Sequence, residues 1–149
     1  ELGGSAVLAS IRMSGEEDYK RYGYATGEEV APGRLRISDM VEKPGPGRID
    51  SDYAVIGGAV YTPEMFDAIA EAMKRLEHDN TPRELVYVDA LKVLLERGAS
   101  CHAVEIVGGK YHDCGNKLEY LKTVVEYGLK HEDLRDEFAK FLGEVKSNL

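Results

Sequence analysis

A strand-like run that leads straight into a helix signal is the feature that most constrains the fold. Residues 53–61 read YAVIGGAVY, and β-branched and aromatic residues of this kind are typical of a strand. Thr62 is expected to cap the helix, Pro63 to occupy its first position and Glu64 its first turn. The inward face of this helix is predicted from 3.6-residue spacing to carry Phe66, Ile69, Met73 and Leu76.

The rest of the chain continues to mix strands with helices, without strict alternation. Strands are predicted over residues 5–12, briefly near 22–25, around Leu35 and Ile37, and over 101–107. Further helices are predicted from about Val86 to Arg97, from about Asn116, and around 134–145. This order predicts an α/β protein in which helices and a mixed sheet form layers.

Length, charge and composition limit the classes of function. The 149 residues suffice for one domain, and we predict a single domain over 1–149. A net charge of −8 argues against nonspecific nucleic-acid binding, although a local lysine or divalent metal would still allow a phosphorylated small molecule to bind. Apolar runs fall short of the ~18 residues that a membrane span needs, and two cysteines are expected to be reduced in a cytoplasmic protein.

The chain starts with ELGGSAVLASIRM, without an initiator Met, and enters a strand-like run almost at once. We therefore expect it to begin within a longer protein, although trimming or missing residues would look the same.

The string VEKP places a carboxylate and a cation side by side at a predicted strand end. Glu42 is suited to accept hydrogen bonds from hydroxyl groups, and Lys43 is suited to bind phosphate. Neighbouring residues of a strand point to opposite faces, so both reach one ligand only if the chain bends, which Pro44 favours. The alternative is an exposed ion pair at a strand end.

Two other stretches contain candidate ligand-binding residues, and each also has a simple structural explanation. The pair Gly57-Gly58 inside a strand indicates either a bulge or the close approach of a ligand. Glu84 is expected to precede a helix and to be free to reach a ligand, whereas Asp89 lies within that helix. Without further information both acids are predicted to be solvated.

Asp113, in the string KYHDCGNKLEYL, is predicted to lie where a strand ends, just before a helix capped by Asn116. A single carboxylate is one ligand of Mg²⁺, which usually keeps several waters and takes oxygens from substrate phosphates. The alternative is a surface acid. His112 beside it is a possible ligand, although a packed or surface histidine is the more common case.

Four strings in order, RISDMVEKP, YAVIGGAVYTPEMFDAI, RELVYVDAL and KYHDCGNKLEYLKTVVEYGL, resemble bacterial and archaeal UTP–glucose-1-phosphate uridylyltransferases. The family strings look like V-E-K-P, V-G-R-Y-V-L-T-P, G-E-I-Q-L-T-D-A and Y-D-C-G-D-K-L-G-Y-L. The resemblance covers nearly the whole chain and places it in the C-terminal half of the family. It implies the C-terminal part of a Rossmann-like fold with a mixed sheet and C-terminal helices.

The resemblance implies a reaction and a set of partners. Glucose 1-phosphate would attack the α-phosphorus of UTP in line and give UDP-glucose and pyrophosphate with Mg²⁺, a chemistry that depends on positioning and charge neutralisation. Members often form dimers or tetramers, so a homo-oligomer is expected, with the apolar stripe around Phe138 and Phe141 as either a core face or a subunit contact.

The resemblance also assigns roles to matched positions. Glu42 and Glu84 would hold sugar hydroxyls, and Lys43 would bind the sugar phosphate. Gly23 and Gly57 would lie against the sugar through their backbones. Asp113 would be a ligand of Mg²⁺.

Departures from the family pattern keep other functions open. Asn116 stands where the family often has Asp, His112 replaces a Tyr, and RELVYVDAL lacks the family's Gly, Gln and Thr. The glycine-rich G-x-G-T-R-x-x-P string and a second metal-binding Asp are missing, so the chain alone is expected to be inactive. The alternatives are a related nucleotidyltransferase that uses dTTP or another sugar, and a non-catalytic module for sugar-phosphate binding or assembly.

Overall fold

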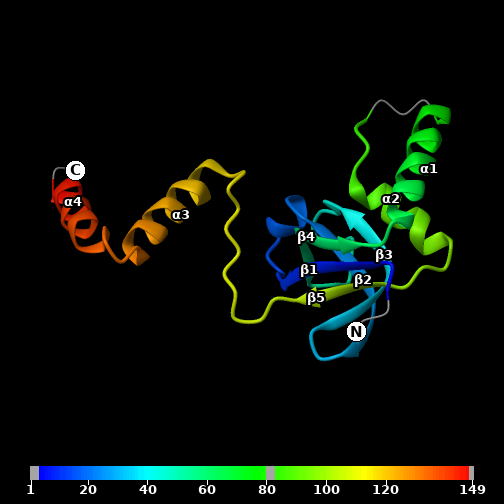
Figure 1. Cartoon of the computed structure of the whole chain (residues 1–149), viewed down its shortest axis with the longest axis horizontal. Helices are drawn as coiled ribbons and strands as arrows, with labels where there is room; N and C mark the ends of the chain where they lie inside the picture. Colours follow the sequence, from blue (N-terminus) through cyan, green and yellow to red (C-terminus); the bar gives the residue numbers. More distant parts are fainter. Residues whose placement is uncertain (1–3, 80–82, 148–149) are drawn as a thin grey trace. The chain divides into compact units, whose positions relative to one another are not determined.

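The computed structural model describes residues 4–79 and 83–147, and it divides into two compact units (Figure 1). The first unit runs to Gly109 and the second begins at Lys110, where the sequence predicted a single domain. Among the residues that the structure describes, every helix is too short or too polar to span a membrane.

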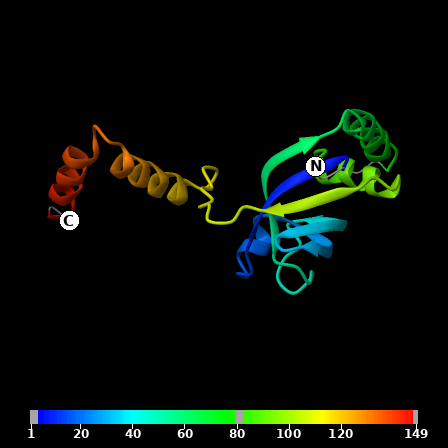
Figure 2. The same cartoon turned by 60° about the horizontal axis from the view of Figure 1, so that its bottom comes forward.

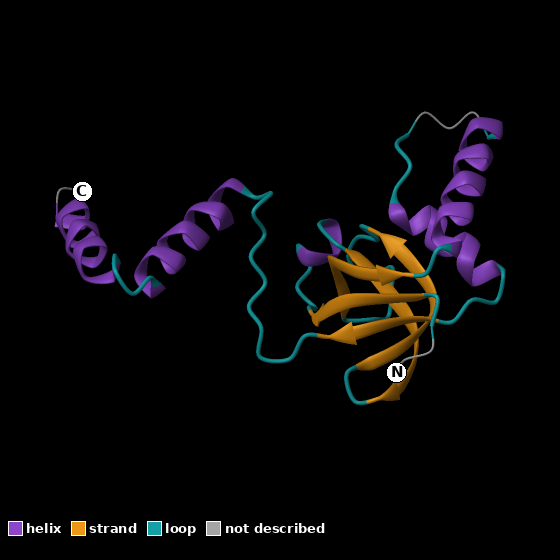
Figure 3. Ribbon diagram, in the orientation of Figure 1, coloured by secondary structure: helices purple, strands orange, loops and turns teal. Residues whose placement is uncertain are grey.

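The first unit is built on a mixed sheet that closes into a barrel (Figure 3). Its strands are β1 (Ala6–Arg12), β2 (Gly23–Ala31), β3 (Arg34–Glu42), β4 (Tyr53–Tyr61) and β5 (Cys101–Glu105). Their order is β1-β4-β2-β3-β5, with antiparallel pairs throughout except for the parallel pair of β1 and β5 that closes the barrel. The predicted α/β class with a mixed sheet is confirmed.

Strand β2 is longer than the short strand predicted near residues 22–25. It extends to Ala31 and forms a hairpin with β3, in which Gly33 adopts a φ of 70° that only glycine adopts without strain. The extension is highly charged, and its Glu28 forms an ion pair with Arg36 of β3. Cross-strand pairing therefore holds a segment whose polar sequence suggested a loop.

A bulge interrupts the pairing of β1 with β4. A bulge was one of the two interpretations of the pair Gly57-Gly58 in the sequence. Leu8 lies opposite Ala59, but Ser10 already lies opposite Val55, so extra residues of β4 are left unpaired between them. Gly57 occupies this bulge with a φ of 94°. The bulge bends β4 and leaves the backbone at Gly57 open, with no atom within 4 Å of the place where a side chain would start.

Helix α1 (Glu64–His78) buries a face that agrees with the prediction only in part: Ile69 packs against the core and Leu76 is half-buried, but Phe66 and Met73 are not on this face. Met65, Ala68 and Ala72 are buried, whereas Phe66 is 76% exposed and Met73 is 48% exposed. Small alanine side chains allow close packing of α1 on α2, which decides the buried face in place of the largest apolar residues. The expected cap was also wrong, because the helix is capped at Pro63 and the Thr62 hydroxyl donates to the Ser5 carbonyl oxygen.

Helix α2 (Tyr87–Glu96) follows the prediction closely. Val88 and Leu91 are buried as expected, and Gly98 ends the helix with a φ of 78°. The core of the first unit lies between this helix, α1 and the sheet (Figure 2). Its largest fully buried apolar side chains include Leu8, Tyr24, Met40, Leu91 and Leu94.

The second unit holds α3 (Lys117–Lys130) and α4 (Arg135–Ser147), which confirms the predicted C-terminal helices. The Asn116 side chain caps α3 by accepting hydrogen bonds from the amides of Leu118 and Glu119, at 3.0 and 3.1 Å. The two helices contact each other at Gly128 and Phe138, yet neither helix has a buried residue. The predicted apolar stripes thus remain largely exposed, with Leu121 at 60% and Phe141 at 54%.

Candidate functional site

The candidate site forms where three strands of the barrel come together. Gly23, the first residue of β2, lies opposite Glu42, the last residue of β3, and opposite Val55 of β4. Gly57 lies two residues farther along β4. Residues that are far apart in the sequence are thereby placed at one end of the sheet.

Gly23 has no room for a side chain. A Cβ atom there would lie 2.8 Å from the Glu42 Oε2 atom, 2.8 Å from the Met40 Cε atom and 3.1 Å from the Tyr87 hydroxyl. Two oxygen atoms therefore face the same point in front of the Gly23 backbone. This crowding explains why the position holds glycine, and because Gly23 is itself buried, the structure does not support its predicted contact with a sugar through the backbone.

The chain bends at Lys43, as the neighbouring proline predicted. Lys43 has a φ of 47°, an unusual value for a residue with a side chain, and its amide donates to the Tyr22 carbonyl oxygen at 3.1 Å. The Lys43 Nζ atom lies 3.9 Å from the Glu42 Oε1 atom, and the lysine side chain is 58% exposed. The bend thus turns both charged groups of the VEKP string toward the same side, and strained backbone of this kind is often found at binding sites.

A cavity of about 530 Å³ links Glu42 with the loop that precedes α2. Its lining includes Glu42 and Glu84, so the structure brings together two acids that were predicted to contact one sugar. Glu84 precedes the helix, as expected, and is exposed.

Asp89 has a different role from its neighbour Glu84, and its prediction as a solvated acid was wrong. Both of its carboxylate oxygens accept hydrogen bonds from Arg83, at 2.7 Å each, and one also accepts from the Val86 amide at 3.0 Å. Arg83, together with this amide, lowers the pKa of Asp89. Asp89 therefore fixes the loop that carries Glu84.

Gly57 lines a second, smaller cavity of about 250 Å³. Tyr87, the first residue of α2, also lines this cavity, and its hydroxyl faces Gly23 as described above. Tyr87 is the residue that connects the Gly57 side of the site with the Glu42 side. Its only signal in the sequence is a tyrosine at the start of a helix, three residues after the candidate acid Glu84.

Asp113 belongs to the second unit and does not lie at the end of a strand, so this prediction was wrong. Strand β5 ends at Glu105, and Asp113 lies in the loop before α3. Its Oδ1 atom accepts a hydrogen bond from the Gly115 amide at 3.1 Å, and its carbonyl oxygen accepts from the Asn116 amide at 3.1 Å. Asp113 thus shapes the turn that leads into the capped helix.

His112 is packed, in agreement with its prediction. The Thr123 hydroxyl donates to the Glu119 carbonyl oxygen, so the His112 Nδ1 atom is the donor in the 2.9 Å contact with that hydroxyl. The His112 ring also meets the edge of Tyr127, with 5.3 Å between ring centres.

The described residues contain no cluster of three or more His, Cys, Asp or Glu side chains that could hold a metal ion. Asp113 by itself matches the part that one protein carboxylate takes in a Mg²⁺ site completed by water and phosphate oxygens. Its turn holds the carboxylate in a defined direction through the Gly115 amide.

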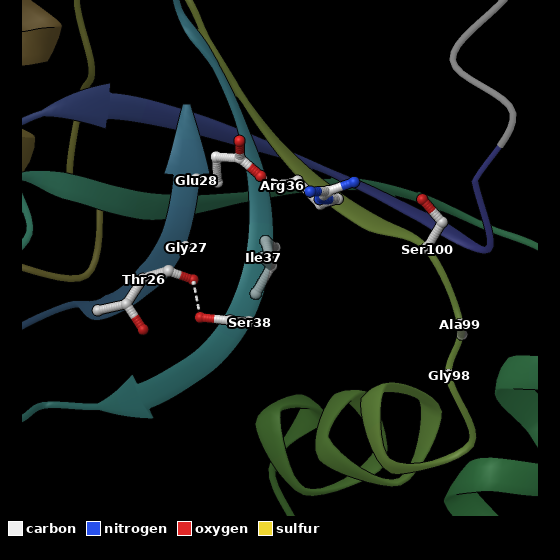
Figure 4. Close-up of a pocket in the computed structure, with 9 residues that line it drawn as sticks. All are labelled: Thr26, Gly27, Glu28, Arg36, Ile37, Ser38, Gly98, Ala99 and Ser100. Atoms are coloured by element: carbon white, nitrogen blue, oxygen red, sulfur yellow. Dashed lines mark hydrogen bonds and ion pairs between the residues drawn. The ribbon is translucent and has the colours of Figure 1, made fainter. Parts of the chain in front are cut away.

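A larger hollow of about 730 Å³ lies along the hairpin of β2 and β3 (Figure 4). Its polar groups bond to one another: Arg36 pairs with Glu28, and the Ser38 hydroxyl donates to the Thr26 carbonyl oxygen at 3.3 Å. None of the residues predicted for the site lines this hollow.

A cluster of side chains centred on Arg12 was not predicted from the sequence. The Arg12 guanidinium binds Asp52 at 2.6 Å, Glu29 at 3.0 Å and Glu105 at 3.3 Å, and it lies over the Tyr53 ring at 3.6 Å. The Gly33 amide and Arg12 lower the pKa of Glu29. The cluster joins four segments of the barrel, and the Arg12 guanidinium is engaged by three carboxylates and one aromatic ring.

Comparisons with known proteins agree with one another. The family model "Nucleotidyl transferase" matches residues 3–128. The UTP–glucose-1-phosphate uridylyltransferase 2 of Staphylococcus saprophyticus is 30% identical over 145 residues, which make up 97% of this chain and 47% of the relative.

Solved structures of two relatives have a similar fold. The UTP-bound UGPase from Acinetobacter baumannii is 27% identical, with a TM-score of 0.71 over 94% of this chain and 45% of that one. A UDP-glucose pyrophosphorylase complexed with UDP-glucose is 30% identical, with a TM-score of 0.71 over 85% of this chain and 45% of that one. The chain therefore spans about half the length of these relatives, and the comparisons do not confirm its expected position in their C-terminal half.

Proposed function

Because the chain belongs to the nucleotidyl transferase family, we propose that it is the sugar-phosphate-binding part of a UTP–glucose-1-phosphate uridylyltransferase. The proposal is supported by relatives of that name and by the cavity into which the structure brings Glu42 and Glu84. The observation that carries it is the cavity of about 530 Å³ that Glu42 and Glu84 line together, because two carboxylates around one hollow provide acceptors for sugar hydroxyls.

In this proposal each residue of the first unit has a simple task. Glu42 and Glu84 line one cavity and accept hydrogen bonds from sugar hydroxyls. The exposed backbone at Gly57 allows the sugar ring to approach closely. Lys43 binds the phosphate, because its exposed ammonium lies beside Glu42 on the strained bend that follows β3.

The proposed reaction is the attack of the glucose 1-phosphate oxygen on the α-phosphorus of UTP, with pyrophosphate as the leaving group. The chain's own residues would hold the nucleophile in place, and their contribution is orientation and neutralisation of charge. We propose Asp113 as one ligand of a Mg²⁺ ion, which when bound would neutralise charge on the phosphates. Since the relatives are about twice as long, we propose that the chain alone binds the sugar phosphate without turnover.

Two other functions make different predictions for the same protein. A nucleotidyltransferase for another sugar would bind that sugar 1-phosphate more tightly than glucose 1-phosphate. A non-catalytic module would bind sugar phosphates but would not lead to a nucleotide sugar even when the rest of a family member is supplied. A pyrophosphorolysis assay with several UDP- and dTDP-sugars, on the longest natural form of the protein, separates these cases.

Calorimetric titration of the chain with glucose 1-phosphate tests the proposed site. We expect saturable binding that Lys43→Ala weakens about tenfold or more, because a charge-assisted hydrogen bond to phosphate is lost. Lys74→Ala is the matched control, since Lys74 is an exposed lysine on α1 and should leave binding unchanged. Equal binding by the Lys43 variant and the wild type would remove the phosphate role from Lys43, and no binding by the wild type would overturn the proposed function.

A further inference from the structure

Lys92 lines the same cavity of about 530 Å³ as Glu42 and Glu84, but the proposed function gives it no task. It belongs to α2 and lies three and four residues after Asp89 and Val88, which line the cavity as well. Residues with this spacing share one face of a helix. One face of α2 therefore borders the cavity, and Lys92 is the cation on that face.

The contact of Lys92 with the protein is weak. Its ion pair is with Asp39 of β3, and 3.5 Å separate the lysine Nζ atom from the Asp39 Oδ1 atom. A charge-assisted hydrogen bond is shorter, at about 2.7–2.9 Å. The lysine side chain is 45% exposed and the aspartate side chain 54%, so the pair contributes little to stability. Lys92 can therefore exchange this partner for a ligand at little cost.

Arg83, the other cation that lines the cavity, is already engaged. Its two terminal nitrogens donate to the two carboxylate oxygens of Asp89 at 2.7 Å each, and one of them also donates to the Glu84 carbonyl oxygen at 3.1 Å. Arg83 lowers the pKa of Asp89 most, and the charge of Lys92 adds to this effect, so that charge is felt at the cavity. An ammonium group has three N–H donors, which leaves Lys92 able to bind a ligand.

Without Lys92 the cavity would be strongly acidic. The Glu42 carboxylate has the Lys43 ammonium at a distance of 3.9 Å, and the Glu84 carboxylate forms no ion pair with any residue that the structure describes. Two such carboxylates around one hollow attract a cationic group of a ligand. The positive charge of Lys92 opposes this attraction.

A hydroxyl group and an ammonium group of a sugar differ in what they offer to this cavity. A hydroxyl donates one hydrogen bond to a carboxylate and can accept another from a lysine. An ammonium group has no acceptor, and its charge is repelled by the lysine. Carboxylates together with a lysine therefore suit a neutral hydroxyl better than an amine.

On this basis we infer that Lys92 is a specificity-determining residue, which donates a hydrogen bond to a sugar hydroxyl in this cavity and disfavours amino sugars. The inference deepens the proposed function and rests on it. It gives the substrate class as neutral sugar 1-phosphates whose ring carries hydroxyl groups and no amine. Specificity of this kind combines an attractive contact with the right ligand and a repulsive contact with the wrong one.

The test measures binding of glucose 1-phosphate and its 2-, 3-, 4- and 6-amino analogues to the wild type and to Lys92→Met by calorimetric titration, at a slightly acidic pH where the amines are protonated. We expect the wild type to prefer glucose 1-phosphate over the analogue whose amine reaches the cavity. Lys92→Met should lose about 3- to 10-fold of that preference, because one hydrogen bond and one screened repulsion are removed. The ratio of two affinities within one variant does not depend on how much of that variant is folded, so a merely structural role would leave the ratio unchanged.

Two further variants serve as controls. Lys92→Arg keeps a cation with N–H donors at the same place and should keep the preference for glucose 1-phosphate. Lys74→Met changes the net charge by the same amount but removes an exposed lysine of α1, so it should also keep the wild-type preference. An equal loss of preference in Lys74→Met and Lys92→Met would trace the effect to net charge and would overturn the inference.

Two negative results have different meanings. If the wild type binds glucose 1-phosphate and Lys92→Met keeps the same preference over every amino analogue, the inference about Lys92 is overturned and the proposed function stands. If the wild type binds none of the sugar phosphates, the proposed function fails and the inference fails with it.

Discussion

The two units of the chain differ in how they use apolar side chains. In the barrel unit, Leu8, Leu91 and Leu94 are almost completely buried between the sheet and its helices. In the helical unit, α3 and α4 bury no residue, and Leu118 and Leu121 are each about 60% exposed. Both units show clear apolar periodicity in the sequence, so periodicity predicted the helices in each but predicted burial only where a sheet lies beneath them.

The physical reason lies in the number of layers. The barrel provides a continuous apolar surface that covers one whole side of α2, whereas two helices packed only on each other leave most of their surface in water. The stability of the first unit should therefore depend on its core, and that of the second on local helix signals and on exposed contacts.

Substitution in the core should have the largest effect. Leu91→Ala removes a fully buried side chain and leaves a cavity, so we expect a loss of about 2–5 kcal/mol in the free energy of unfolding of the barrel unit. The counterpart Leu121→Ala on α3 should change stability by less than about 0.5 kcal/mol. Denaturant titration followed by circular dichroism measures both, and similar losses for the two variants would contradict the contrast between the units.

The second-largest loss of stability is expected from a substitution in the cluster centred on Arg12. Arg12→Met leaves Asp52, Glu29 and Glu105 near one another without their cation, and we expect a loss of about 1–2 kcal/mol after allowance for solvent screening. Arg135→Met, which breaks an exposed contact with Asp136 on α4, should have almost no effect. Thermal unfolding of both variants decides this, and a barrel that tolerates Arg12→Met would show that the cluster is not important for its stability.

The helix cap should have a smaller effect, confined to the second unit. Asn116→Ala removes the acceptor for two amides at the start of α3, which should cost about 1 kcal/mol of helix stability. Asn116→Asp keeps the acceptor, so the amides at the start of α3 should stay protected from hydrogen exchange as in the wild type. Amide hydrogen exchange reports both, and loss of protection in the barrel as well would contradict a local role.

The smallest expected effect is a pH dependence that is specific to the barrel. His102 is buried, and burial, followed by the charges of Arg34 and Arg36, lowers its pKa. The unfolded chain therefore binds a proton at higher pH than the folded one, so stability should be complete above about pH 6.5, the ordinary pKa of histidine, and should fall as pH drops below it. His102→Leu should flatten this part of the profile in unfolding experiments between pH 7 and 5.5, and an unchanged slope would refute the assignment.

The sequence predicted those parts of the candidate site that depend on local chain geometry. Pro44 indicated the bend at Lys43, the glycine pair indicated the bulge of β4, and the string before α2 placed Glu84 outside the helix. It did not predict the role of Asp89, because the Arg83 pair forms only after the loop has folded back. It also placed Asp113 at the end of a strand that in fact stops at Glu105.

Local signals in the sequence determined which segments become strands and helices: the β-branched run of β4, Gly98 after α2 and the asparagine before α3 act on neighbouring residues alone. Only the tertiary structure decided that the sheet closes through β1 and β5, that α1 buries its alanines, and that Tyr87 meets Glu42 in front of Gly23. These contacts join residues that are distant along the chain, and their formation depends on the shape and space left by all the other side chains. No short stretch of sequence carries that information.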